Sequence, residues 1–165
     1  MAFLCLETSR FGAPVESVWL PNPLLVAALI ATPRSGWIAV IALVAVGRTS
    51  AHLATGDPPD FSLAFLFGDM SEGALCAYLL APRTMAFETR RDVFRFLLGC
   101  GLVGPLISAA VAAAGTWLIY RDLALQDVAM WFSADALGLL FFLPLVHGFD
   151  RGRMRKLATK PIQLT

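Results

Sequence analysis

Charged residues are scarce in this sequence. They make up 15% of the chain, against roughly a quarter in soluble domains, whereas 58% of its residues are hydrophobic. This balance excludes an ordinary soluble globular domain. The formal net charge of +1 leaves no surplus of lysine and arginine to neutralise phosphates, which excludes nucleic acid as a partner. The composition indicates an integral membrane protein.

Cysteine and histidine are also scarce. The three cysteines, Cys5, Cys76 and Cys100, form no CxxC pair, and the last two fall within apolar runs, where a thiol behaves as a small hydrophobic group. The two histidines, His52 and His147, lie in different apolar runs. We find no phosphate-binding glycine loop, no serine or cysteine nucleophile beside a histidine and no HExxH motif. The sequence therefore predicts no enzyme activity, no catalytic residue, no disulfide, no metal site and no evident cofactor.

What the chain has instead is a series of long apolar runs. A helix needs about 20 apolar residues to cross roughly 30 Å of hydrocarbon, because every backbone amide must be satisfied within the segment. Runs that meet or approach this length predict an all-α integral membrane protein, a single domain over residues 1–165 built as a bundle of about five transmembrane helices. The expected helices cover residues 15–32, 37–55, 61–81, 92–120 and 127–148.

Prolines interrupt several of these runs. Pro21 and Pro23 stand one residue apart in the first, so we expect a helix broken there, with an extended or kinked start and a short helix from Leu24 to Thr32. The sequence leaves open whether this segment spans the membrane or is re-entrant. Pro105 and Pro144 are expected to kink the fourth and fifth helices.

Lysine and arginine are distributed unevenly between the alternate loops. With five crossings, one side holds only Arg10 and Arg121, while the other holds the remaining loop arginines and a basic tail over residues 150–165. Cytoplasmic loops carry the excess of basic residues, so we expect the amino terminus outside and the carboxy terminus in the cytoplasm. A re-entrant first segment would move only the amino terminus inside. The tail is expected to touch anionic headgroups, with a docking strip for a cytoplasmic partner as the alternative. Its membrane-proximal basic residues are Arg151, Arg153, Arg155 and Lys156.

Ionisable residues within the apolar runs are costly in a bilayer, so each needs a partner or a function. Counted inward at 1.5 Å per residue, Arg48, Asp69 and Asp135 fall at a common depth of roughly 12 Å below the outer surface. Glu72 shares a helix face with Asp69, and His52 lies one turn from Arg48. We predict that these five residues form a buried polar layer.

Two interpretations of the polar layer stay open. In the first, Arg48 neutralises the carboxylates and the layer fixes helix register without any ligand. In the second, three carboxylates exceed the single arginine, and the layer is a small-ligand or proton-sensing pocket open to the outside. Trp131, Gly138 and Phe142 are expected on the same helix face as Asp135.

A stripe of small residues marks the fourth run, where Gly104, Ser108, Ala112 and Thr116 recur at every fourth position. Small side chains allow a second helix to approach closely. We expect this face to pack within the chain, with a dimer contact as the alternative.

Five stretches, taken in order, resemble the bacterial membrane sensor domain called MASE1. They are VWLPNP at 18–23, GDMSEGALCAYLL at 68–80, RRDVFRFLL at 90–98, SAAVAAAGTWL from Ser108 and WFSADALGLLFFLPL from Trp131. The family landmarks fall on Trp19, Pro21, Asn22, Glu72, Arg91, Asp92, Val93, Arg95, Phe96, Trp131, Asp135, Gly138 and Pro144. The chain departs from the pattern at Ala134, where the family has a glycine, and at Asp69, where an asparagine is usual.

The resemblance implies a sensory domain of the bacterial inner membrane that feeds a cytoplasmic histidine kinase, diguanylate cyclase or phosphodiesterase. The family generally has about eight helices, whereas about five are expected here, and the sequence ends after the basic tail. We therefore expect a non-catalytic accessory or structural subunit of a larger membrane complex, for example photosynthetic or respiratory, with lipid or pigment at its periphery. The alternative is a stand-alone sensor or receptor fragment that signals to a separate histidine kinase or cyclic-di-GMP effector. Both roles imply other integral membrane proteins and anionic lipids as partners.

Overall fold

A computed structural model of the chain describes residues 19–80, 89–121 and 124–148, and every regular element within these ranges is helical. Four helical stretches are long and apolar enough to cross a membrane: Arg34–Ala54, Pro59–Leu80, Arg90–Tyr120 and Leu125–Val146. The predicted all-α membrane bundle is confirmed. Its α-helices are α2 (Pro21–Ala31), α3 (Trp37–Ala54), α4 (Pro59–Leu80), α5 (Arg90–Leu98), α6 (Gly104–Tyr120), α7 (Leu125–Leu137) and α8 (Leu143–Gly148), joined by the 3-10 turn η1 (Arg34–Gly36) and the π-helical turns η2 (Gly99–Val103) and η3 (Gly138–Phe142).

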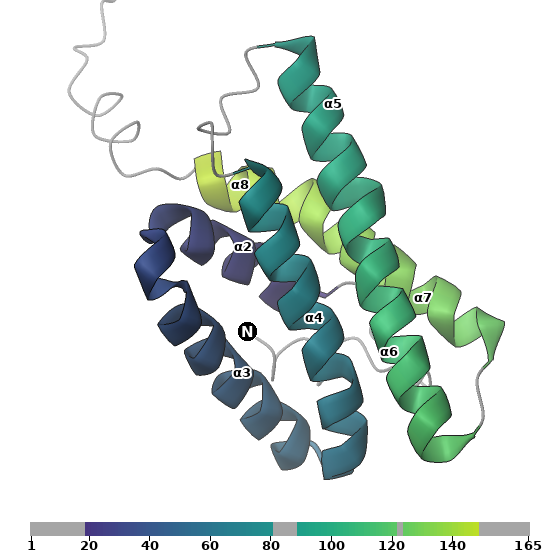
Figure 1. Ribbon diagram of the computed structural model, residues 1–165. Coiled ribbons are helices and arrows are strands. Elements are labelled where there is room, and N and C mark those ends of the chain that lie inside the picture. The colour runs from purple at the N-terminus through teal and green to yellow at the C-terminus, as the bar shows by residue number, and fades with distance from the viewer. Residues whose placement is uncertain (1–18, 81–88, 122–123, 149–165) are drawn as a thin grey trace, which may run out of the picture.

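Helix α4 is at the centre of the bundle. Figure 1 shows α3 on one side of it and the continuous rod of α5 and α6 on the other, with α7 and α8 passing behind. The short helix α2 packs against α3, α4 and α8. Every long helix therefore has a face toward α4 or toward a direct neighbour of α4.

The first helix corrects an expectation, because its two prolines begin α2 instead of breaking it. Pro21 and Pro23 occupy the first turn, where backbone N–H groups have no intrahelical acceptor and a proline removes no hydrogen bond. The helix expected from Leu24 thus starts three residues earlier and ends at Ala31. With 11 residues, α2 is roughly 16 Å long, about half the thickness of the hydrocarbon layer. The described residues thus provide four helices long enough to span a bilayer and one shorter apolar helix.

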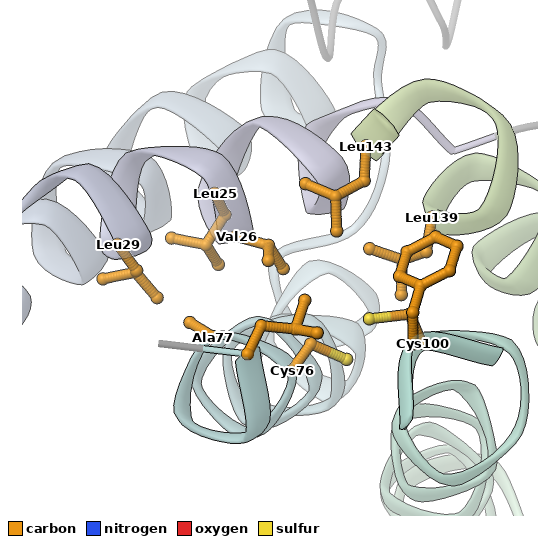
Figure 2. Packing of buried hydrophobic residues seen from close by; sticks show 10 residues of the cluster. Leu25, Val26, Leu29, Cys76, Ala77, Cys100, Leu139 and Leu143 are labelled. Atoms are coloured by element: carbon orange, nitrogen blue, oxygen red, sulfur yellow. The ribbon is translucent and has the colours of Figure 1, made fainter. Parts of the chain in front are cut away.

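The apolar core lies where α2, α4 and the two π-helical turns meet. Both cysteines in it are free thiols and fully buried, and they pack as the small hydrophobic residues that the sequence indicates. The side chains labelled in Figure 2 are Leu25, Val26, Leu29, Cys76, Ala77, Cys100, Leu139 and Leu143. This core holds α2 against α4 beside the polar residues described below.

A proline follows shortly after each π-helical turn. Pro105 and Pro144 are the second residues after η2 and η3. Proline has no N–H, and its ring collides with the carbonyl four residues earlier, which here belongs to Gly101 or Leu140. The wider π turn accommodates this conflict, so the expected kinks take the form of π turns. The two turns touch, because a Cβ added at Gly101 would lie 3.1 Å from the Leu140 side chain.

The small-residue stripe of α6 packs against α4 within the chain. Gly104, Ser108 and Ala112 are buried, and Thr116 is half-buried. The two helices approach closely at Gly68 of α4, where an added Cβ would lie 2.9 Å from the Ser108 carbonyl oxygen. Such close approach requires small residues on both helices.

Helix α5 begins with a capping box. The Thr89 hydroxyl accepts a hydrogen bond from the Asp92 backbone N–H at 3.2 Å, and the Asp92 carboxylate accepts one from the Thr89 N–H at 3.2 Å. Replacing Thr89 with alanine is expected to lower the free energy of unfolding by about 1 kcal/mol, measured by denaturant titration in micelles. Thr89→Ser keeps the hydroxyl and should retain the stability; an equal loss in both variants would contradict the capping role.

Candidate functional site: a buried polar cluster

All five ionisable residues of the predicted polar layer are buried, each 5% exposed or less. Arg48 and His52 come from α3, Asp69 and Glu72 from α4, and Asp135 from α7. On α4, the three-residue spacing of the two carboxylates places both on one face. Four of the five meet around one point, and His52 bonds to Asp57 in the loop after α3.

Arg48 is the cation of this site. Its Nε donates to Asp69 Oδ2 in a buried ion pair, and its Nη1 donates to the Ser62 carbonyl oxygen at 3.1 Å. The guanidinium also lies 5.4 Å from the centre of the Trp19 ring, a cation–π contact. These contacts fix the arginine between α3, α4 and the start of α2.

Asn22 is the residue at the centre of the site, and the sequence analysis placed it only among the family landmarks. Its Nδ2 donates to Asp69 at 3.3 Å, to Glu72, and to Asp135 at 3.4 Å. Its Oδ1 accepts a hydrogen bond from Trp19 Nε1 at 3.2 Å, which sets the orientation of the amide. The sequence did offer one indication that Asn22 belongs to the site. It is a polar amide in an apolar segment, and a buried amide requires hydrogen-bond partners. We call Asn22, Arg48, Asp69, Glu72 and Asp135 the polar cluster.

The three carboxylates of the polar cluster lie very close together. One oxygen from each of Asp69, Glu72 and Asp135 lies within 4.8 Å of the other two. An all-oxygen set of this kind is able to hold a hard metal ion. The sequence predicts no metal site, and the spacing of these residues, two on α4 and the third on α7, matches no metal-binding motif. Only the tertiary fold makes the grouping visible.

His52 bonds to a residue that was not among the candidates. Its Nδ1 lies 2.6 Å from Asp57 Oδ2, in the loop that follows α3. The imidazole also lies 5.8 Å from the Trp19 ring, centre to centre. His52 therefore links the end of α3 to Trp19, beside the polar cluster.

Gly138 packs closely against the backbone of Trp19, which precedes α2. A Cβ added at Gly138 would lie 2.2 Å from the Trp19 carbonyl oxygen, so only glycine fits here. The Trp19 N–H also donates to the Ala134 carbonyl oxygen at 3.4 Å. Two family landmarks that are far apart in the sequence, Trp19 and Gly138, thus form one contact between the start of α2 and the end of α7.

Of the four residues predicted to share one face of the last helix, three are buried together. Trp131, Asp135 and Gly138 are buried, and Trp131 packs edge-on against Phe65 with ring centres 4.5 Å apart. Phe142 is 37% exposed, whereas Leu143 is fully buried in its place. The cause is the π turn η3, which adds a residue to the helical turn between Gly138 and Phe142. Pro144, in α8, is half-buried.

The remaining candidates lie away from the polar cluster. Arg91 and Arg95 are exposed on α5, and Asp92 caps that helix. Asp92 thus stabilises the start of α5, and none of these three residues belongs to the polar cluster. The basic tail, with Arg151, Arg153, Arg155 and Lys156, lies outside the described residues.

This fold and site define a helical membrane bundle that encloses a cluster of buried charged side chains. A model of the MASE1 family matches residues 2–158, and the chain belongs to that family. A curated relative is the probable diguanylate cyclase DgcE of Escherichia coli strain K12, which is 22% identical over 143 residues; the match covers 85% of this chain and 13% of the relative. No solved structure matches the chain.

Membership of the family establishes the broad role. MASE1 is a membrane-associated sensory input domain, typically linked to cyclic-di-GMP or kinase effectors, and it is not itself catalytic. The resemblance stated from the sequence is confirmed. Because the match spans 13% of the relative, the cyclase activity in that protein's name is not assigned to this chain.

Proposed function

We propose that this chain is the input part of a bacterial signalling system in which the polar cluster senses a stimulus and the helices around it pass the change to a cyclic-di-GMP or kinase effector. One observation carries the proposal. Side chains from α2, α3, α4 and α7 meet at a single buried point. A change of charge or contact there acts on four helices at once.

The burial of ionisable groups in the polar cluster supports a sensing role. Arg48, Asp69, Glu72 and Asp135 are each 5% exposed or less, and charge is costly in a membrane interior. A proton or ligand that reduces this cost in one helix arrangement more than in another shifts the population toward the favoured arrangement. The polar cluster is therefore suited to convert a binding event into helix displacement.

The membrane placement is part of the proposal. We place the chain in the bacterial inner membrane and keep the orientation of the four long helices that the distribution of arginine and lysine favours. Because α2 is too short to span, a re-entrant first segment, with both ends of the chain on the cytoplasmic side, fits the described residues. The end of α8 then faces the cytoplasm, where an effector would act.

The accessory-subunit role expected from the sequence stays a prediction. Purification in mild detergent tests it: co-migration with a large complex at fixed stoichiometry would support the subunit role, and a free monomer or dimer would contradict it. The diguanylate cyclase named as a relative supports the signalling proposal instead.

The Asp135→Asn variant tests the signalling proposal. We expect that joining this chain to the cyclase portion of the Escherichia coli relative gives a fusion whose cyclic-di-GMP output changes by about 5-fold or more in Asp135→Asn, the lower end of typical coupling between sites. The substitution removes a negative charge without changing the side-chain volume.

A matched control is Asp127→Asn, in the first turn of the same helix and half-buried, which should leave the output unchanged. Equal output from the two variants at equal protein level would contradict the proposal. Unfolding of Asp135→Asn would instead favour a purely structural polar cluster.

A further inference from the structure

Helix α5 extends beyond the rest of the bundle. Figure 1 shows it reaching past the ends of α4 and α8. The rod that α5 forms with η2 and α6, Arg90–Tyr120, has 31 residues. At 1.5 Å per residue it is roughly 46 Å long, whereas the hydrocarbon layer is about 30 Å thick. Part of the rod therefore lies outside the hydrocarbon, among the lipid headgroups.

Aromatic residues indicate which part of the rod this is. Trp117 and Tyr120 are exposed at the end of α6, and exposed tryptophan and tyrosine prefer the membrane interface. The Arg121 guanidinium lies 4.8 Å from the centre of the Trp117 ring, so a charged side chain lies at the same level. Counted from Trp117, about 20 residues of helix cross the hydrocarbon and end near Leu97. Most of α5 then lies in the opposite headgroup layer.

Arg91 and Arg95 are exposed and share one face of α5. Asp92, between them, is held in the capping box. Every ion pair among the described residues starts from α3, so neither arginine is paired with a carboxylate within that part of the chain. Like charges four residues apart repel each other. A phosphate between the two guanidinium groups would remove the repulsion and accept hydrogen bonds from both.

An apolar stripe continues from these arginines along the rod. It consists of Leu98, Leu102 and Leu106, which are 41%, 43% and 50% exposed. They follow Arg95 at spacings of three or four residues, which keep all three on the same face as the arginines. The stripe begins where the hydrocarbon begins and runs inward. One face thus presents positive charge at headgroup depth and leucine side chains at acyl-chain depth.

We propose that this face binds an anionic phospholipid, with the phosphate on Arg91 and Arg95 and an acyl chain along Leu98, Leu102 and Leu106. A charged head joined to an apolar tail matches both halves of the face. An acidic soluble protein would cover the arginines and leave the leucines, which lie within the hydrocarbon. A zwitterionic lipid would cover the leucines but bring a positive charge toward the arginines. The bound lipid would hold α5 at the membrane surface.

Native mass spectrometry of the purified full chain in neutral detergent tests the lipid site. We expect one dioleoyl phosphatidylglycerol per chain, bound at least about 5-fold more tightly than dioleoyl phosphatidylcholine, the effect typical of one basic residue near an anionic surface. The double variant Arg91→Gln with Arg95→Gln should lose this preference. Glutamine is a good helix former, so the helical circular dichroism signal should not change. The matched control is Arg34→Gln, which removes an exposed arginine beside Tyr78 and should keep the preference.

Three results would overturn the lipid site: equal affinity for the two lipids, an equal loss in Arg34→Gln and in the double variant, or displacement of the lipid by an equal concentration of glycerol 3-phosphate. The last result would mean that the leucine stripe takes no part. Unchanged lipid affinity in the double variant, together with loss of output from the cyclase fusion, would assign the face to the effector instead. The polar cluster is not part of this face, so the Asp135→Asn fusion still judges the signalling proposal separately.

Discussion

Replacing Arg48 with methionine is expected to lower the free energy of unfolding by about 3–5 kcal/mol, the typical cost of removing one partner from a buried ion pair. Methionine preserves much of the length of the side chain, whereas the Asp69 carboxylate, 5% exposed, loses its positive partner. Ser62 also loses the donor to its carbonyl oxygen. The measurement is a denaturant titration of the purified chain in micelles, followed by the helical circular dichroism signal.

Two controls separate the ion pair from general effects of the substitution. Arg34→Met removes an exposed arginine that lies 5.0 Å from the centre of the Tyr78 ring, and it should cost less than about 1 kcal/mol. The double variant Arg48→Met with Asp69→Leu should recover most of the loss, because it removes both charges of the pair. If Arg48→Met and Arg34→Met cost the same, the buried pair does not stabilise the bundle.

Gly138→Ala is expected to lower the free energy of unfolding by about 1–3 kcal/mol, the usual range for overpacking. The added Cβ would stand 2.2 Å from the Trp19 carbonyl oxygen. That oxygen belongs to the backbone and has no side-chain torsion that could move it away. The segment before α2 must shift, which weakens the Trp19 hydrogen bond to Asn22 and the contact of its ring with Arg48. The same titration measures the loss.

Gly47→Ala is the matched control for this substitution. A Cβ at Gly47 on α3 would meet nothing within 4 Å, and alanine is preferred over glycine in a helix by about 1 kcal/mol. This variant should be as stable as the unmodified chain or more stable. Equal behaviour of the two alanine variants would show that the contact between Trp19 and Gly138 is not tight.

The convergence of charged side chains could be predicted because it depends on simple quantities. A helix rises 1.5 Å per residue, and charge is costly in hydrocarbon, so Arg48, Asp69 and Asp135 could be assigned a common depth from the sequence. The structure brings these three together with Glu72. A shared helix face is not sufficient, however. His52 follows Arg48 by four residues on the same face, but it lies one turn nearer the end of α3 and bonds to Asp57 in the following loop.

The role of Asn22 could not be predicted, because its position depends on how α2 starts. A proline both breaks a helix interior and begins a helix well. The local sequence around Pro21 and Pro23 does not indicate whether they break a helix or begin one. The packing of Leu25, Val26 and Leu29 against α4 places α2 in the bundle and its first turn beside the carboxylates. That packing is a tertiary effect, outside the reach of helix-end patterns.

The π turn η3 has a consequence for comparing this chain with related sequences. Each residue of an α-helix advances by about 100° around its axis, so one additional residue rotates everything after it by that angle. Leu143 is fully buried and Phe142 is 37% exposed, so Leu143 takes the angular position that Phe142 would have in an uninterrupted α-helix. A relative whose helix is α-helical throughout would therefore align with this chain across a gap of one residue between 138 and 142.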